Sequence, residues 1–136
     1  MWGMRHQLFV HLIWTTRGRE PLIDLAIARF LEPYIRRVAQ SERAMVLEVG
    51  IVQTHLHLLL RISPQTSLPR LIQRLKGGSS HLAAIEGHSA RGHELRWAKG
   101  YNLQSVSPRA LPIVRDYVRH QPENHPHESI PGWLPS

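Results

Sequence analysis

Two histidines one residue apart stand inside an apolar run, THLHLLLRI, at 54–62. Such a run is typical of a buried β-strand, on which residues i and i+2 point to the same face. His55 and His57 therefore project side by side, while the leucines between them face the core. Two neutral imidazoles on a rigid strand form a platform for a divalent metal. The alternative is a pair of hydrogen-bonded histidines on an exposed sheet face, and the motif alone does not exclude it.

A tyrosine and a glutamine near the C-terminus add to this pattern. In the helical segment LPIVRDYVRHQ, Tyr117 and Gln121 are spaced i, i+4 and so lie on one face, one turn apart. The glutamine carbonyl could complete the protein ligands of a metal, with the tyrosine hydroxyl beside it. A phenol titrates near pH ~10 and is a poor nucleophile at neutral pH, so a metal on the attacked phosphate would help by neutralising charge and fixing geometry. The alternative for Tyr117 is a core aromatic whose hydroxyl reaches the surface.

The charge balance favours a polyanionic partner. Lys and Arg number 17 against 10 for Asp and Glu, a net charge of +7, and Lys76 and Lys99 are the only lysines. Arginine offers a planar donor fork that suits phosphate and can stack on bases, which points to nucleic acid. The alternative is a basic surface kept for solubility, or a coding bias toward arginine.

Length and composition bound the class of protein. A chain of 136 residues fits one domain with its own core, taken to span 1–136. It has no cysteine, which excludes disulfides and thiolate–metal sites and favours a cytoplasmic location. The apolar runs are too short to span a bilayer, and the N-terminal stretch lacks the cleavage site of a signal peptide, so no membrane partner is expected.

Apolar periodicity predicts strands and helices in the order β-α-β-β-α-β-α. The strands are expected at 5–15, 44–52, 54–62 and 101–107; the helices are expected at 21–42, from a cap at Thr66 or Ser67 through Leu82, and at 111–121, with a loop at 86–100. We expect Pro33 to kink or split the first helix and Pro122 to end the last one, which leaves 122–136 as an irregular, proline-rich tail. Gly77 and Gly78, within the second helix, indicate either a close backbone approach or a helix break.

This order predicts an α+β, ferredoxin-like or RRM-like fold. Its antiparallel sheet would carry helices on one face, with an added C-terminal helix that bears Tyr117. The other face of the sheet would be free for a ligand or a partner. Because this layout serves many functions, the fold alone does not decide the function.

The sequence resembles, in five blocks that cover most of the chain, the single-tyrosine HUH transposases of the insertion-sequence-200-like kind, which include the repeat-associated tyrosine transposases. The blocks are HLIWTTRGREPLI, VQTHLHLLLRIS, LIQRLKGGSSHL, WAKGYNLQSVS and VRDYVRHQPENH. The resemblance implies a DNA transposase that cuts single-stranded DNA at hairpins and stays attached to the 5′ phosphate through a tyrosine. It implies Mg²⁺ or Mn²⁺ without a small-molecule cofactor. It also implies a homodimer, in which the tyrosine helix of one subunit can complete the site of the other.

The resemblance assigns roles to four residues of this chain. His55 and His57 match the HUH histidines and would bind the metal. Tyr117 matches the nucleophile, and Gln121 matches the third metal ligand. The histidines would then be one residue apart because a strand presents both to one ion.

The sequence departs from the family's pattern at two points. The family often has an acidic residue directly before the first histidine, where this chain has Thr54. Many relatives have paired histidines near the end, where this chain reads QPENHPH, so the roles of His125 and His127 stay open. Neither departure touches the three ligands or the nucleophile.

Several basic residues outside these motifs are candidate DNA contacts. Arg70, Arg74 and Lys76 lie on or near the exposed face of the second predicted helix and could meet phosphates. Arg17 and Arg19 follow the first predicted strand. A solvated surface is the alternative for these residues.

Three functions are compatible with these motifs. A metal-dependent tyrosine transposase is favoured. The main alternative is a non-catalytic or domesticated module of the same fold that binds hairpin DNA or RNA. A metallohydrolase without a covalent step is disfavoured, because no carboxylate ligand stands beside the histidines.

An apolar first strand, which must not stay exposed, is consistent with pairing of sheet edges between two subunits.

Overall fold

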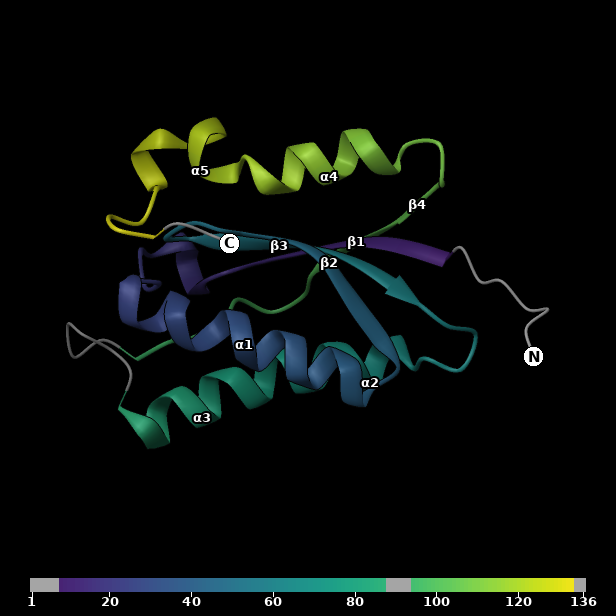
Figure 1. Ribbon diagram of the computed structural model, residues 1–136. Coiled ribbons are helices and arrows are strands. Elements are labelled where there is room, and N and C mark those ends of the chain that lie inside the picture. Colours follow the sequence, from purple (N-terminus) through teal and green to yellow (C-terminus); the bar gives the residue numbers. More distant parts are fainter. Residues whose placement is uncertain (1–7, 88–93, 134–136) are drawn as a thin grey trace.

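The computed structural model describes residues 8–87 and 94–133, which form a four-stranded antiparallel sheet between two layers of helices (Figure 1). The strands are β1 Leu8–Thr15, β2 Ala44–Ile51, β3 His55–Ile62 and β4 Asn102–Val106, in the spatial order β2-β3-β1-β4. Neighbouring strands are antiparallel throughout. The predicted α+β sheet is confirmed, although the start of the first predicted strand, 5–7, lies outside the described residues.

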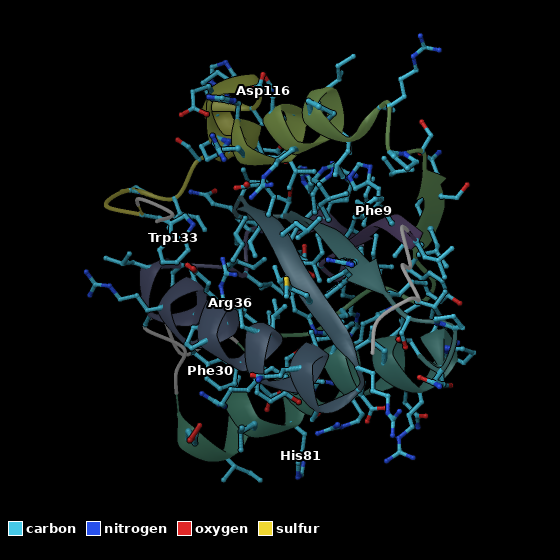
Figure 2. The ribbon with its side chains drawn as sticks, turned by 45° about the vertical axis from the view of Figure 1, so that its right-hand side comes forward. Phe9, Phe30, Arg36, His81, Asp116 and Trp133 are labelled. Carbon is cyan, nitrogen blue, oxygen red and sulfur yellow. The ribbon has the colours of Figure 1, made fainter. Side chains whose placement is uncertain are left out.

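The helices are divided between the two faces of the sheet. One layer contains α1 Leu25–Ser41, α2 Leu68–Gln73 and α3 Ser79–Glu86, with a π-helical turn at Arg74–Gly78 joining the last two. The other layer contains α4 Leu111–Arg119 and the short α5 Gln121–Asn124, and 3-10 turns lie at Arg17–Arg19 and Pro126–Glu128. Figure 2 shows the two layers at opposite ends of the molecule, with Asp116 on one and His81 on the other.

The side chains of β3 alternate between these layers. Leu56, Leu58 and Leu60 are fully buried in the main core, beneath α1, α2 and α3. Leu59 faces the other way and packs with Val118 of α4 in a smaller apolar cluster. Because this apolar patch needs cover, α4 lies over part of the sheet face that was expected to be free.

Helix α1 runs without interruption through Pro33. Asp24 caps it by accepting a hydrogen bond from the Ile27 amide at 2.9 Å. A proline inside a helix leaves the carbonyl four residues earlier without its usual donor, and that residue, Arg29, is exposed to water. The expected split at Pro33 is therefore absent, because solvent can satisfy the freed carbonyl.

Gly78 marks a close approach between α1 and the helix that follows β3. A Cβ atom at this position would clash with the hydroxyl of Tyr34 on α1. That hydroxyl donates to the carbonyl of Arg74 at 2.9 Å, at the start of the π-helical turn. Of the two predicted explanations for this glycine, close backbone approach to another element is the correct one.

The C-terminal segment is more ordered than expected. The last predicted helix bends at His120, and Pro122 lies in the first turn of α5, where a missing amide does no harm. The following tail packs on the β2–β3 turn: the Gln53 amide donates to the Glu128 carbonyl at 2.8 Å, and Ile130 is buried. The expectation of an irregular tail that begins at Pro122 was therefore wrong.

Strand β1 is interior to the sheet. It pairs with β3 on one side and β4 on the other, so the described edges of the sheet are β2 and β4. An apolar β1 thus needs no partner subunit to cover its edge, and that argument for a dimer does not hold. None of the helices in 8–87 and 94–133 has the length and apolar character needed to cross a membrane.

Candidate active site

Four residues predicted from the motifs meet on the α4 side of the sheet. β3 supplies His55 and His57, whose ring centroids are 5.2 Å apart and which are each only 4% exposed. α4 supplies Tyr117, whose ring lies 5.6 Å from that of His57. Gln121, at the start of α5, is fully buried, and its side chain lies against Gly50 of β2.

His57 is fixed by a histidine that sequence reasoning missed. His11 on β1 is buried, and its Nε2 lies 2.8 Å from Nδ1 of His57. In the sheet His11 pairs with Leu59, so it is a diagonal neighbour of His57 on the same face. The signal in the sequence was a histidine within the apolar first strand, but its significance depends on the register of two strands that are far apart in the chain.

His57 is held neutral by its surroundings. Burial lowers its pKa to about 3, and the neighbouring His11, His55 and His125 act in the same direction. A neutral imidazole is the form that binds a metal. Because Nδ1 faces His11, Nε2 is the nitrogen left for a ligand.

His55 has a different hydrogen-bond partner. Its Nδ1 lies 3.0 Å from the Thr54 hydroxyl, which donates to the carboxylate of Glu128 in the tail. Burial lowers the pKa of His55, while the neighbouring Gln121 side chain and the Glu128 carboxylate act in the opposite direction. The pKa of Glu128 is itself lowered, first by the hydrogen bond from Thr54. The arrangement pairs a neutral imidazole with an ionised carboxylate through one hydroxyl.

Gln121 presents a buried oxygen with spare capacity. Its Nε2 donates to the Tyr117 carbonyl at 3.1 Å, but its Oε1 is buried and has no hydrogen bond of good geometry among the described residues, although the Gln121 side chain lies close enough to His55 to raise the pKa of that imidazole. Such an oxygen is costly to leave unpaired and marks a place for a ligand. The described ranges contain no group of three or more His, Cys, Asp or Glu that could hold a metal, so a metal here would need this amide oxygen beside the two imidazoles. Two imidazole nitrogens and one amide oxygen fit a divalent ion.

Helix α4 is held on the sheet of its own chain. A Cβ at Gly50 of β2 would clash with the carbonyl of Val118, so the glycine lets α4 approach the strand. Beside it, Glu48 accepts hydrogen bonds from Arg115 Nε at 2.8 Å and Arg119 Nη2 at 2.9 Å. Burial raises the pKa of Glu48, but the hydrogen bonds from these arginines outweigh it and lower the pKa overall. These contacts set the position of Tyr117 relative to the histidines.

Tyr117 is accessible from solvent. Its side chain is 45% exposed and lines an open cavity of about 530 Å³ on the outer side of α4 and α5. The centroid of its ring also lies 6.1 Å from that of His11, with the two rings nearly perpendicular, so the tyrosine stands between solvent and the buried histidines. A group outside the protein can therefore reach the Tyr117 ring.

The predicted DNA-contact residues lie elsewhere, and three of them have protein partners. Arg70 and Arg74 pair with Glu42 at the end of α1, at 3.1 and 2.6 Å. Lys76 Nζ donates to the carbonyls of Ala98 at 2.9 Å and of Gly100 at 2.6 Å, and so anchors the segment before β4.

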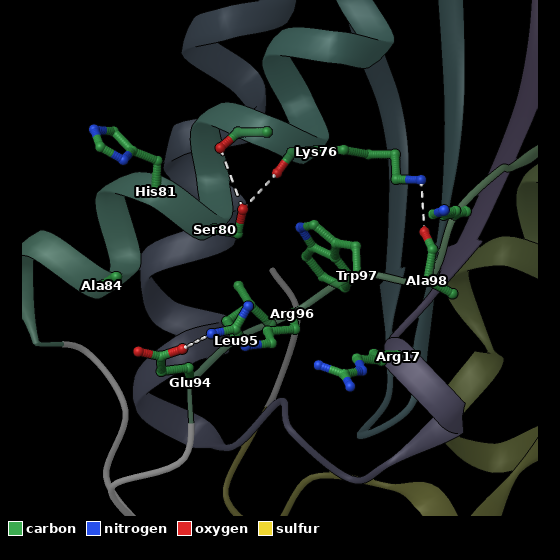
Figure 3. Close-up of a pocket in the computed structure, with 12 residues that line it drawn as sticks. Arg17, Lys76, Ser80, His81, Ala84, Glu94, Leu95, Arg96, Trp97 and Ala98 are labelled. Carbon is green, nitrogen blue, oxygen red and sulfur yellow. Dashed lines mark hydrogen bonds and ion pairs between the residues drawn. The ribbon is translucent and has the colours of Figure 1, made fainter.

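Arg17 lines a cavity of about 620 Å³ between the segment before β4 and α3 (Figure 3). Arg96, Lys99 and Lys76 line the same cavity and make it basic. Arg19 is near enough to His55 and Glu128 for its charge to lower the pKa of both. The DNA contacts of these residues stay predictions.

The family profile described as "Transposase IS200 like" matches residues 4–121. The chain therefore belongs to the IS200-like transposases, a family of enzymes that cleave DNA and transfer strands.

Individual relatives agree with this family. The ISDra2 transposase TnpA of Deinococcus radiodurans is 27% identical over 123 residues, which cover 88% of this chain and 87% of that protein. The transposase for insertion sequence element IS200 of Salmonella typhimurium is 26% identical over 117 residues, covering 83% and 76%. A solved REP-associated tyrosine transposase bound to a REP hairpin has a TM-score of 0.69 at 14% identity and covers 98% of this chain and 76% of its own. A crystal structure from Deinococcus radiodurans has a TM-score of 0.67 at 24% identity, covering 89% and 95%.

Proposed function

We propose that this protein is a metal-dependent single-strand DNA endonuclease and strand transferase, in which Tyr117 is the nucleophile and His55, His57 and Gln121 hold Mg²⁺ or Mn²⁺. One observation carries the proposal: an exposed tyrosine lies against two buried, neutral histidines and a buried amide oxygen without a partner. Membership of the IS200-like family supports DNA as the substrate. The REP hairpin bound by a structural neighbour supports hairpin DNA in particular.

The chemistry divides between the tyrosine and the phosphate. The Tyr117 hydroxyl loses its proton to solvent and its oxygen attacks the phosphorus, while the bond from phosphorus to the 3′ oxygen breaks. The 3′ oxygen takes up a proton, and the 5′ end stays attached as a phosphotyrosine. A 3′ hydroxyl of another strand then reverses these steps and releases Tyr117. When bound, the divalent metal would neutralise charge on the phosphate and fix its orientation.

The protein residues prepare this site before DNA arrives. With the proton of His57 on Nδ1, His11 accepts a hydrogen bond from it, and Nε2 of His57 is left unprotonated as the ligand atom. The contacts of α4 with Glu48 and Gly50 bring Tyr117 to the histidines of the same chain. We therefore propose cleavage by a tyrosine acting in cis. The homodimer and the cytoplasmic, DNA-associated location stay predictions.

A denaturing gel tests the proposed function. Labelled single-stranded oligonucleotides that carry the hairpins flanking the gene are incubated with protein and Mg²⁺ or Mn²⁺. We expect a metal-dependent band at the mass of protein plus DNA, which Tyr117→Phe and His55→Ala abolish. Tyr101→Phe is the matched control, because Tyr101 is also exposed but lies before β4. An undiminished adduct in Tyr117→Phe would refute the proposal, and hairpin binding without any adduct would favour a non-catalytic binding module.

A further inference from the structure

The tail after α5 reaches the metal site through a single carboxylate. Figure 1 shows this segment returning from α5 to the sheet. There Glu128, at the end of the 3-10 turn, accepts a hydrogen bond from the hydroxyl of Thr54. The same hydroxyl lies 3.0 Å from Nδ1 of His55, and Thr54 is almost fully buried. Thr54 thus connects a residue of the tail with a histidine of β3.

The direction of these hydrogen bonds follows from the chemistry of the three groups. A hydroxyl has one proton, and Thr54 gives it to the carboxylate of Glu128. Its oxygen can then only accept from His55, so the proton of the neutral imidazole lies on Nδ1. The lone pair of His55 is left on Nε2, the nitrogen that is free to bind a metal.

We propose that Glu128 is a positioning residue of the metal site, which acts on His55 through Thr54 and makes the docked tail part of that site. The inference rests on the proposed function, because it assumes that His55 binds a metal. Hydrogen bonds of this kind orient metal-binding histidines and raise their basicity, and losing one typically lowers metal affinity about 10–100-fold.

The tail delivers this carboxylate from a fixed position. The Gln53 amide donates to the Glu128 carbonyl at 2.8 Å, and the Gln53 side chain donates to the Ser129 carbonyl at 3.1 Å. Ile130 is buried just beyond. The second oxygen of Glu128 lies 3.5 Å from Nδ1 of His125. Backbone bonds and apolar burial therefore hold the tail in place, so Glu128 is not required merely to anchor it.

The experiment measures the affinity of the full-length protein for Mn²⁺ alone, by calorimetry, in the absence of DNA. We expect Glu128→Ala and Thr54→Val each to lower this affinity about 10–100-fold, and the double variant to lose little more, because both remove the same connection. Glu123→Ala is the matched control, since Glu123 is an exposed acid on α5. Thermal unfolding without metal verifies that each variant is folded.

A rescue variant separates positioning from anchoring of the tail. Thr54→Asp places a carboxylate directly beside His55, so Thr54→Asp combined with Glu128→Ala should recover most of the Mn²⁺ affinity. A purely anchoring role predicts no recovery, because an acid at position 54 does not reattach the tail. Wild-type affinity in both Glu128→Ala and Thr54→Val, or failure of the rescue, would overturn the inference. If the wild-type protein forms the DNA adduct while these variants bind Mn²⁺ normally, only this inference fails; if the wild type binds no Mn²⁺, the proposed metal site fails with it.

Discussion

The two faces of β3 are both buried, but they are buried in different ways. Leu56, Leu58 and Leu60 face a continuous apolar core, where tight packing is the only requirement. On the opposite face His55 and His57 are also buried, at 4% exposed each, although burying a polar group is costly unless it is hydrogen-bonded. One nitrogen of each ring has a protein partner, and the other is available. The comparison shows that one face of this strand serves packing alone, while the other combines the packing of Leu59 with two polar rings, which the proposed function uses as metal ligands.

The largest effect should come from removing a ligand on the polar face. His57→Asn keeps an amide that can donate to His11 but loses the ligand nitrogen Nε2. Loss of a hydrogen-bond partner of a ligand typically lowers metal affinity about 10–100-fold. Loss of the ligand itself should lower Mn²⁺ affinity and adduct formation by more than that, with little loss of stability. Calorimetry and urea denaturation measure the two quantities. A variant that unfolds while its folded fraction still binds Mn²⁺ normally would contradict the division between the faces.

The matching change on the apolar face should have the opposite profile. Leu58→Ala leaves a cavity in the main core and should lower the free energy of unfolding by about 2–5 kcal/mol. Adduct formation per folded molecule should stay close to that of the wild type. Urea denaturation gives the first value, and a gel at a temperature where the variant is folded gives the second. A specific loss of Mn²⁺ affinity with unchanged stability would mean that the faces are not separate in function.

The contact between His11 and His57 should have an intermediate effect. His11→Leu removes the acceptor and should weaken Mn²⁺ binding about 10–100-fold, while His11→Gln can place an amide oxygen near the same point and should recover part of the loss. Hairpin binding in the presence of a chelator should be unchanged in both variants. Equal Mn²⁺ affinity in His11→Leu and the wild type would show that β1 does not prepare the site.

The smallest effect should come from the contacts that hold α4. Glu48→Gln weakens its ion pairs with Arg115 and Arg119, whose side chains are half exposed, so stability should fall by no more than about 1 kcal/mol. Faster hydrogen exchange in α4 and a modest loss of adduct should accompany it. Glu32→Gln, which removes the charge that pairs with Arg36 on α1, is the control and should leave α4 unchanged. Equal exchange of α4 in the two variants would contradict this role of Glu48.

The sequence predicted those features that depend on local periodicity. The alternation along β3 and the i, i+4 spacing of Tyr117 and Gln121 are both visible in the chain itself. The predicted end of the last helix was wrong. Pro122 resembles a helix terminator, but because the chain bends at His120, this proline lies in the first turn of α5. Local pattern could not show that bend.

Other parts of the site depend on contacts between distant segments. His11 becomes significant only once the register of β1 and β3 is known, and Glu128 only once the tail packs beside Thr54. The hydrogen bonds of Lys76 to the carbonyls at 98 and 100 could not be predicted either, because those carbonyls belong to a segment with no periodic pattern. Sequence spacing was enough to propose the reacting groups, whereas the residues that contact them were found only in the three-dimensional packing.

Identification of the residue that carries the DNA tests the central claim most directly. The chain has three tyrosines, Tyr34, Tyr101 and Tyr117, so proteolysis and mass spectrometry of the Mn²⁺-dependent adduct can distinguish them. Tyr34 is buried and donates to the Arg74 carbonyl, whereas Tyr101 and Tyr117 are both exposed. The proposed function predicts a nucleotide-modified peptide that contains Tyr117. A modified Tyr101, or a cleaved strand with no tyrosine attached, would contradict it.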